Sequence, residues 1–469
     1  MVIKMNNKSS NKKVNIMTNL SETEKKENSE SKINVRAAVF RELCHYTEND
    51  TFINISIDNA IKKLNLTGFD RDFFTALVYG VIERQITLDY FLSNLSSKPL
   101  KKLDLTVLTA LRMGAYQILF MDRIPDSAAC NESVKLIKKC TASAVPFVNA
   151  VLRSLIRQKN SIIFPNKTKA PEKYLSVRYS VPEKLIVMWE KMYGKEITEN
   201  ILSGIDTPPP ITLRANTLKI TREELLYKLT DKGVDAVYST ESKYGIRLRK
   251  SIPVSSLECM ENGLCIVQDD ASSLSVEALD LSPGHTVIDV CSAPGGKSLS
   301  AAMLMKNKGK ILSFDLYENR LKLIKDSSDR LGISIIQTEC FDSTEYKKEL
   351  EYTADRIICD VPCSGLGVLA KKPDIRCRAF DRVCESNESA LTSLQYKILC
   401  SSSRYLKKNG KMTYSTCTLN KHENEDIVNR FVSEHPDYKI LDVRTFFPDG
   451  TLDAYLRTDG FFYALITRT

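Results

Sequence analysis

Several kinds of signal are missing from this sequence of 469 residues. No apolar run is long enough to span a membrane, and the N-terminus carries no apolar region typical of a signal peptide. We therefore expect a cytoplasmic protein without a membrane partner. The thirteen cysteines include no Cys-x-x-Cys pair, and the four histidines are scattered along the chain. These absences argue against a metal site and against histidine-based catalysis, and they favour cysteines that are free thiols.

The length and the charge narrow the class further. The chain is too long for one ordinary hydrophobic core, so we expect two or three domains. Lysine and arginine exceed aspartate and glutamate by 67 to 58, a net charge of +9 at pH 7, which favours a nucleic-acid partner. Residues 1–33 are polar and predict a disordered tail, whose basic half, with Lys12 and Lys13, fits an RNA contact or a solvated segment.

Residues 34–165 predict an all-α bundle of five to seven helices, because apolar side chains recur at helical spacing. Three stripes are expected in its core: Phe73, Phe74, Leu77, Val78, Val81 and Ile82; Leu108, Leu111, Ala115, Ile118 and Leu119; Phe147, Val148, Val151, Leu152, Leu155 and Ile156. The basic residues beside them fit an RNA-facing surface or a solvated face: Arg71, Arg84, Lys98, Lys101, Lys102, Lys135, Lys138, Lys139, Arg153 and Arg157.

Residues 170–267 predict a small α+β module of the RRM or ferredoxin type. Three prolines at 208–210 break the chain, and strands are expected at 211–216, 237–238, 245–250 and 263–267. A helix at 221–232 should begin with Thr221 as its cap and Glu224 three residues on. Four basic residues of the predicted strands are candidates for contacting phosphate: Arg214, Arg247, Arg249 and Lys250.

Residues 268–469 alternate strand and helix, which predicts an α/β domain with a doubly wound parallel sheet. The polar segment 268–273 begins it and caps a helix at 272–279. Further helices are predicted at 297–305 and 319–331, and strands at 287–290, 310–315, 333–338, 355–360 and 411–416. Ligands of such sheets bind beyond the carboxyl ends of the strands.

Ligand-type residues gather at those predicted strand ends. Pro294 fixes a backbone angle, and Gly295 with Gly296 allows a sharp turn and the close approach of a ligand. Alone, this turn fits an empty strand–helix connection equally well. Asp315, Asp342 and Asp360 follow neighbouring strands, and Asp315 lies ~20 residues after the glycines, where an acid binds ribose hydroxyls. Together they predict a nucleoside-type cofactor.

The form of the turn restricts which cofactor is expected. The Gly-x-Gly-x-x-Gly fingerprint of NAD sites is absent, and residues 295–298 lack the upstream glycine of a phosphate-binding loop. S-adenosylmethionine has a ribose and an adenine but no phosphate. It therefore fits an acid-lined pocket better than NAD or ATP.

Two cysteines follow predicted strands at the same edge, Cys363 after Asp360 and Cys417 after residues 411–416. A thiolate that adds to C6 of cytosine makes C5 nucleophilic enough to take a methyl group, and loss of the C5 proton then expels the thiolate. One cysteine would add and the other group would assist release; the spacing leaves open which does which. Four other cysteines are expected to be buried apolar residues: Cys44, Cys259, Cys265 and Cys400.

Five motifs of the last domain resemble those of the RsmB/NOP family of RNA cytosine-C5 methyltransferases. They are residues 291–297, 360–364, 372–376, 414–417 with 423–425, and 459–463. Residues 34–38, 123–126 and 148–153 resemble the NusB-type RNA-binding domain, so the likeness extends from about residue 34 to the end. The sequence departs from the family pattern at Cys291, Ser292, Val361, Cys377 and residues 420–422, and no departure removes a catalytic group.

The resemblance implies a Rossmann-like class I methyltransferase domain with a mostly parallel seven-stranded sheet, S-adenosylmethionine as cofactor and no metal. It implies that Cys417 is the nucleophile, that Cys363 assists breakdown of the adduct, that Asp360 contacts the base and borders the cofactor, and that Lys297 orients Asp360. Asp315 would bind the ribose and Asp342 would lie near the adenine. The methionine part would be held by Cys291, Ser292, Ala293, Pro294, Gly295, Gly296 and Lys297.

The resemblance also implies a substrate. The target would be C5 of a cytosine in 16S ribosomal RNA, cytosine 967 in the usual rRNA numbering, and the enzyme would act as a monomer. A tRNA methyltransferase with the same catalytic domain stays an alternative within the class. An RNA-binding ribosome-assembly factor with an idle enzyme domain is the alternative of another class.

Overall fold

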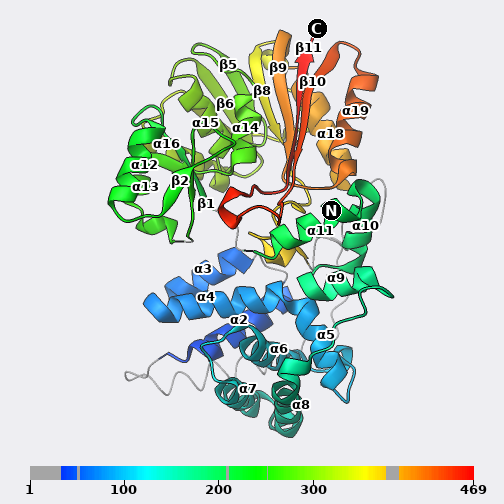
Figure 1. The fold of residues 1–469 in the computed structure, drawn as a ribbon. Coiled ribbons are helices and arrows are strands. Elements are labelled where there is room, and N and C mark those ends of the chain that lie inside the picture. Colours follow the sequence, from blue (N-terminus) through cyan, green and yellow to red (C-terminus); the bar gives the residue numbers. More distant parts are fainter. Residues whose placement is uncertain (1–32, 50–52, 208–210, 251, 377–389) are drawn as a thin grey trace. The chain divides into compact units, whose positions relative to one another are not determined.

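The computed structural model describes residues 33–49, 53–207, 211–250, 252–376 and 390–469 (Figure 1). Residues 1–32 of the predicted tail, the prolines at 208–210 and Cys377 lie outside these ranges. The chain divides after Ser180 into two compact units. Within the described ranges, no helix is long and apolar enough to cross a membrane.

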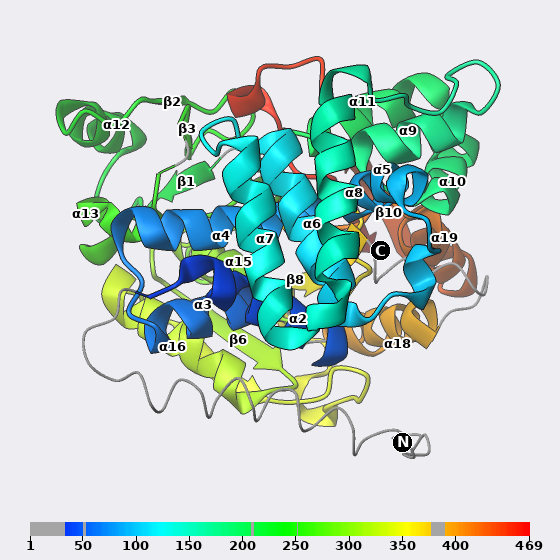
Figure 2. The ribbon, with the colours of Figure 1, turned by 90° about the horizontal axis from the view of Figure 1, so that it is seen from below.

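The first unit contains the predicted helical bundle and one further helix, Pro171–Tyr179, from the segment that was predicted as part of the α+β module. Its helices are α2 (Val35–Asn49), α3 (Ile53–Lys63), α4 (Gly68–Glu83), α5 (Gln85–Leu95), α6 (Leu105–Phe120), α7 (Asp126–Cys140), α8 (Val145–Gln158) and α9 (Pro171–Tyr179). Helix α6 packs against α2, α4, α5, α7 and α8, so it is buried on most of its surface. Figure 2 shows α6, α7 and α8 side by side.

The predicted stripes form the core of this bundle. All their members are buried except Phe73, Leu108, Leu119, Phe147 and Ile156, which are half-buried at its margin. Of the ten basic residues beside the stripes, Arg71 and Arg84 are half-buried and the others are exposed. The contact of these exposed residues with RNA stays a prediction.

The second unit begins with α10 (Glu183–Tyr193) and α11 (Lys195–Ile205), followed by a small antiparallel sheet. Its strand order is β2-β3-β1-β4, from β1 (Ile211–Ala215), β2 (Ala236–Tyr238), β3 (Gly245–Leu248) and β4 (Cys265–Val267). Helix α12 (Arg222–Asp231) has the predicted capping box, because Thr221 Oγ1 accepts from Glu224 N at 3.2 Å and Glu224 Oε2 accepts from Thr221 N at 2.9 Å. The α+β module is therefore confirmed.

The rest of the second unit is built on a seven-stranded sheet of order β10-β11-β9-β8-β5-β6-β7. Strands β5 (Thr286–Asp289), β6 (Lys310–Asp315), β7 (Ile336–Cys340), β8 (Ala354–Asp360) and β9 (Leu406–Thr416) are parallel. Strands β10 (Tyr438–Phe446) and β11 (Phe461–Arg468) join antiparallel beside β9. The predicted mostly parallel sheet of seven strands is thus confirmed.

Helices cover both faces of this sheet, and alternate strand residues point to opposite faces. Val287 and Ile358 pack with α14 (Asp270–Glu277) and α15 (Gly296–Leu304), whereas Ile288 and Ile357 pack with α18 (Ala390–Ser403) and α19 (Glu425–Glu434). Burial on both faces explains why these strands are continuous apolar runs in the sequence.

One strand lies later than predicted. The strand expected at 333–338 is β7, at Ile336–Cys340. Helix α16 (Glu318–Leu331) ends at Gly332, whose φ of +75° lets Ile333 N donate to Ser328 O. Ile333 therefore belongs to the helix cap, although its apolar side chain imitates a strand.

Candidate active site

Two cysteines meet at the carboxyl edge of the sheet. Strands β8 and β9 are parallel neighbours with Asp360 opposite Ser415, so the loops that follow them start side by side. Cys363 Sγ and Cys417 Sγ lie 3.1 Å apart, close enough to share a proton. Both side chains are only partly buried.

The two thiols differ in acidity because they interact with each other. The hydrogen bond from Cys363 lowers the pKa of Cys417, and the charges of Lys372 and Lys297 lower it further. Burial and the charge of Asp360 act in the opposite direction and raise this pKa, but their effect is smaller. The same hydrogen bond, together with burial, raises the pKa of Cys363 well above its usual value. Cys417 is therefore the sulfur that more readily becomes a thiolate, and thiolates are the reactive form of cysteine.

An ion pair adjoins the sheet edge near these thiols. Lys297 Nζ lies 2.8 Å from Asp360 Oδ2 and 5.1 Å from the centre of the Phe461 ring. Ser415 Oγ donates to Asp360 Oδ1 at 2.7 Å. Since the Asp360 side chain is 31% exposed and that of Lys297 is 11% exposed, a polar ligand can reach the carboxylate.

The predicted cofactor turn and Asp315 lie together. Ser292 N and Oγ donate to Phe314 O at 2.8 and 2.9 Å, and Ala293 N donates to Asp315 Oδ2 at 3.2 Å. The Ala293–Pro294 peptide is cis, and Gly295 has a φ of +111°, a conformation that favours glycine. This turn leads directly into α15, so its backbone is bare at a helix N-terminus. Burial raises the pKa of Cys291 well above its usual value, which keeps this thiol neutral.

Asp315 and Asp342, predicted to lie near the ribose and the adenine, differ in their solvent exposure. Asp315 is 4% exposed and accepts from Tyr317 N at 3.1 Å, with Arg320 Nη1 3.1 Å from Oδ2. Asp342 is exposed and caps its own turn, accepting from Thr344 N at 2.9 Å. Phe341 N donates to Asp315 O at 3.1 Å, so the turn with Asp342 starts beside Asp315.

The donor set of this edge fits a nucleoside-type cofactor with an amino-acid part. Carboxylates suit hydroxyl and ammonium groups, and bare glycine backbone admits a close ligand. Asp289 Oδ1 is buried and accepts no hydrogen bond from the described residues, while Ser298 Oγ donates to Oδ2 at 2.6 Å. Burial raises the pKa of Asp289 to about 7. Among the described residues, His, Cys, Asp and Glu side chains form no group of three or more arranged to hold a metal.

Sequence reasoning missed several residues that hold the site in place. Lys371 Nζ lies 2.7 Å from Asp459 Oδ2 and 3.6 Å from Asp269 Oδ2. Burial and Asp269 raise the pKa of Asp459 to about 6. Glu423, which is 1% exposed, accepts hydrogen bonds from both cysteine loops. The sequence placed Glu423 in the family motif at 423–425, but it did not show which residues the carboxylate contacts.

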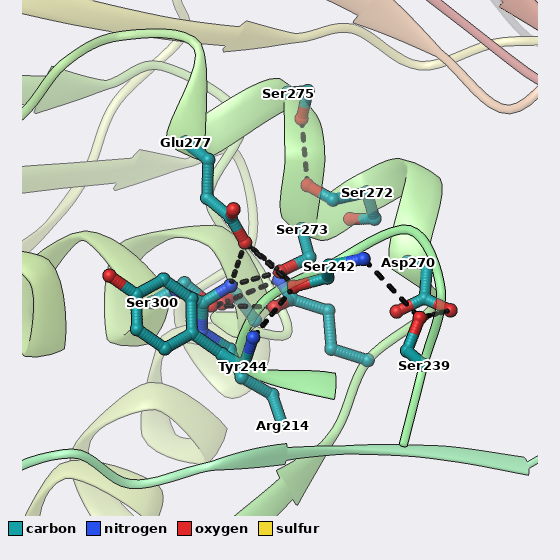
Figure 3. Close-up of polar contacts among 12 residues, drawn as sticks. Arg214, Ser239, Ser242, Tyr244, Asp270, Ser272, Ser273, Ser275, Glu277 and Ser300 are labelled. Carbon is teal, nitrogen blue, oxygen red and sulfur yellow. Dashed lines mark hydrogen bonds and ion pairs between the residues drawn. The ribbon is translucent and has the colours of Figure 1, made fainter. Parts of the chain in front are cut away.

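Two of the four predicted phosphate contacts were wrong. Arg214 and Arg247 are 1% and 0% exposed and face α14 rather than solvent. Arg247 Nε donates to Asp270 Oδ2 at 2.6 Å, and Arg214 Nη1 donates to Glu277 Oε1 at 3.1 Å. Figure 3 shows Arg214, Tyr244 and Glu277 in this buried network. Arg249 and Lys250 are exposed, and their contact with phosphate stays a prediction.

Three family models match successive parts of the chain. The NusB family matches residues 33–157, the ferredoxin-like domain of RsmF/B-like methyltransferases matches residues 181–255, and the 16S rRNA methyltransferase RsmB/F model matches residues 276–467. These segments correspond to the helical bundle, to α10 and α11 with most of the small module, and to the domain of the large sheet.

Similar proteins cover nearly the whole chain. The probable ribosomal RNA small subunit methyltransferase B of Bacillus subtilis (strain 168) is 36% identical and covers 92% of this chain and 98% of its own. A protein of the same description from Synechocystis is 31% identical over 92% and 99%. The crystal structure of PH0851 is 26% identical, with a TM-score of 0.74, over 94% and 100%. The chain belongs to the RsmB/F family of 16S rRNA methyltransferases.

Proposed function

We propose that this protein transfers a methyl group from S-adenosylmethionine to C5 of a cytosine in 16S ribosomal RNA, through a covalent bond between Cys417 and C6 of the base. The observation that carries the proposal is the Cys363–Cys417 pair, with sulfurs 3.1 Å apart at the sheet edge that also holds the Lys297–Asp360 ion pair. Relatives described as ribosomal RNA small subunit methyltransferase B support the substrate class.

The cofactor would be held by the turn from Cys291 to Lys297 and by the acids at the strand ends. Asp315 would accept from the ribose hydroxyls, and Asp342 would lie near the adenine. When bound, S-adenosylmethionine would supply an electrophilic methyl group and would leave as S-adenosylhomocysteine. The neutral Cys291 adds no competing charge beside the ligand.

Cys417 begins the chemistry as a thiolate. Its sulfur forms a bond to C6, the C5–C6 double bond opens, and C5 becomes nucleophilic enough to accept the methyl group. Loss of the C5 proton to a base then restores the double bond and breaks the bond between sulfur and C6. Cys363 donates its S–H to the departing thiolate, and the same contact that lowers the pKa of Cys417 makes it a better leaving group.

Asp360 would contact the polar edge of the cytosine. Its partly exposed carboxylate can accept from the amino group of the base, and Ser415 and Lys297 fix its orientation. The base must leave its stack to reach Cys417, at a cost of a few kcal/mol. The exposed basic residues of the helical bundle would supply salt-dependent affinity for RNA.

The test is methyl transfer from labelled S-adenosylmethionine to unmodified 16S ribosomal RNA and, separately, to tRNA. Transfer to the ribosomal RNA at a cytosine is expected, and Cys417→Ala should lower it by at least about 10³-fold, because no other group replaces the nucleophile. Transfer to tRNA alone would overturn the substrate, and an unchanged rate in Cys417→Ala would overturn the mechanism. Mapping the modified nucleotide tests the assignment to cytosine 967.

A further inference from the structure

Glu423 is a buried carboxylate held by three separate segments of the chain. Its Oε2 accepts from Ser364 N and Gln395 Nε2, both at 2.9 Å. Its Oε1 accepts from Ser364 Oγ at 2.6 Å and from Asn420 Nδ2 at 2.9 Å. A buried carboxylate is costly unless its oxygens are satisfied, and these four donors satisfy them in a fixed geometry.

These contacts enclose Cys363 from both sides. Ser364 follows the cysteine and donates twice to Glu423. Pro362 precedes it, and Pro362 O accepts from Gln395 Nε2 at 2.9 Å, the same amide group that donates to Glu423. Both neighbours of Cys363 are therefore held by one carboxylate and its amide partner.

The next residue in the chain does the same for Cys417. Asn424, which is 0% exposed, accepts from Thr416 Oγ1 at 2.6 Å through Oδ1. Its Nδ2 donates to Thr418 O at 2.9 Å. Thr416 and Thr418 are the residues on either side of Cys417, so one amide side chain holds both.

The position of Asn424 suggests an ordinary alternative, which the contacts do not support. Asn424 is the N-cap residue of α19, where an asparagine side chain normally accepts from the backbone of the first turn. Its side chain makes no such capping hydrogen bond. The side chain is turned instead toward the two neighbours of Cys417.

The two cysteine loops are also joined to each other. Ser364 Oγ and Thr418 Oγ1 lie 2.7 Å apart, and Tyr414 OH donates to Glu423 O at 2.6 Å. Gly367 N donates to Cys417 O at 3.0 Å. The separation of the two sulfurs therefore depends on these direct links and on the dipeptide Glu423-Asn424, in which Glu423 holds Ser364 beside Cys363 and Asn424 holds both neighbours of Cys417.

We propose that Glu423 and Asn424 are positioning residues with separate roles: Glu423 places Cys363 for release of the product, and Asn424 places Cys417 for attack on the base. This inference rests on the proposed covalent mechanism. It predicts opposite defects for two adjacent residues. Loss of the Glu423 contacts should slow release, and loss of the Asn424 contacts should slow formation of the adduct.

Two isosteric substitutions test this division. In Glu423→Gln an amide nitrogen must face donors that it cannot accept from, so the Cys363 loop loses part of its anchor. In Asn424→Asp a carboxylate oxygen faces Thr418 O in place of a donor. Each purified full-length protein is mixed with 16S ribosomal RNA and S-adenosylmethionine, and the RNA-linked fraction is followed on a denaturing gel alongside Cys363→Ala and Cys417→Ala.

Glu423→Gln should accumulate adduct as Cys363→Ala does, with release slowed about ten-fold or more, and Asn424→Asp should form adduct about ten-fold more slowly than the native protein. Glu425→Gln is the matched control. It changes the other glutamate of the motif, whose buried Oε2 has no partner among the described residues, and should behave as the native protein. Ser364→Ala removes one oxygen that contacts both Glu423 and Thr418, and it should accumulate adduct to a smaller extent.

The possible results distinguish a failure of the two positioning roles from a failure of the proposed covalent mechanism. If Cys363→Ala accumulates no adduct, the proposed role of Cys363 in release fails, and the role of Glu423 fails with it. If Cys363→Ala accumulates adduct while Glu423→Gln and Ser364→Ala release product at the native rate, the role of Glu423 is wrong. Equal loss of adduct in Glu423→Gln and Asn424→Asp, with unchanged thermal unfolding, would show one shared structural role and overturn the division. If Glu423→Gln does not fold, Ser364→Ala decides the result in the same way.

Discussion

Two clusters of the second unit both pair cationic side chains with carboxylates, but they differ in solvent exposure. In the first, Arg214 and Arg247 pair with Glu277 and Asp270, and both arginines are at most 2% exposed. In the second, Lys297 pairs with Asp360, whose carboxylate stays 31% exposed beside partly buried thiols. The closed cluster joins the small module to α14, whereas the open cluster keeps a carboxylate and two sulfurs within reach of a ligand. The two clusters therefore differ in solvent exposure and not in the kind of charge: the buried cluster stabilises the fold, and the exposed one can contact a ligand.

Breaking the closed cluster should cost the most stability. Asp270→Ala leaves the Arg247 guanidinium buried without its carboxylate, and we expect the free energy of unfolding of this unit to fall by about 3–5 kcal/mol in denaturant titrations. The double variant Arg247→Met with Asp270→Leu should recover most of the loss, because it removes both charges. A loss below ~1 kcal/mol in Asp270→Ala would show that the cluster does not hold the module.

Asp315→Asn should affect binding more than stability. Hydrogen bonds to charged groups contribute roughly 1.5–3 kcal/mol, so the affinity for S-adenosylmethionine should fall about 10- to 100-fold in calorimetric titrations. Its ion-pair partner Arg320 is 46% exposed, so unfolding should change much less than in Asp270→Ala. Asp342→Asn is the matched control, and a larger effect there would reverse the assignment of the two acids.

Lys297→Met should shift the titration of Cys417. The Cys363 hydrogen bond lowers the pKa of Cys417 most, and the charge of Lys297 contributes in the same direction. Removing that cation disfavours the thiolate, so the pH of half-maximal alkylation should rise, by about one unit or less. Below that pH the variant should react more slowly than the native protein. Lys297→Arg, which keeps the charge, should titrate as the native protein; a downward shift in Lys297→Met would contradict this account.

Much of the fold could be predicted because the signals are local. The apolar runs before Asp315 and Asp360 end where β6 and β8 end, since strands buried on both faces are continuous apolar segments. The Thr221 capping box needs only four adjacent residues. The strand β7 was predicted to start too early, because the side chain of Ile333 fits a helix cap and a strand equally well.

The contacts that distinguish the two clusters could not be predicted in the same way. Arg247 meets Asp270 across 23 residues, and Arg214 meets Glu277 across 63, so nothing in their local sequence marks them as buried. The roles of Cys363 and Cys417 came from family resemblance, and their sequence separation of 54 residues did not determine the sulfur distance. The Glu423 contacts depend on loops that only the folded sheet brings together.

The most direct test of the covalent mechanism is the identity of the residue that bonds to RNA. Cys363→Ala protein is incubated with S-adenosylmethionine and unmodified 16S ribosomal RNA, the complex is digested with nuclease and protease, and the peptide that carries a nucleotide is identified by mass spectrometry. The covalent mechanism predicts a methylated cytidine residue attached to Cys417. A nucleotide on any other residue, or methyl transfer with no adduct at all, would contradict it.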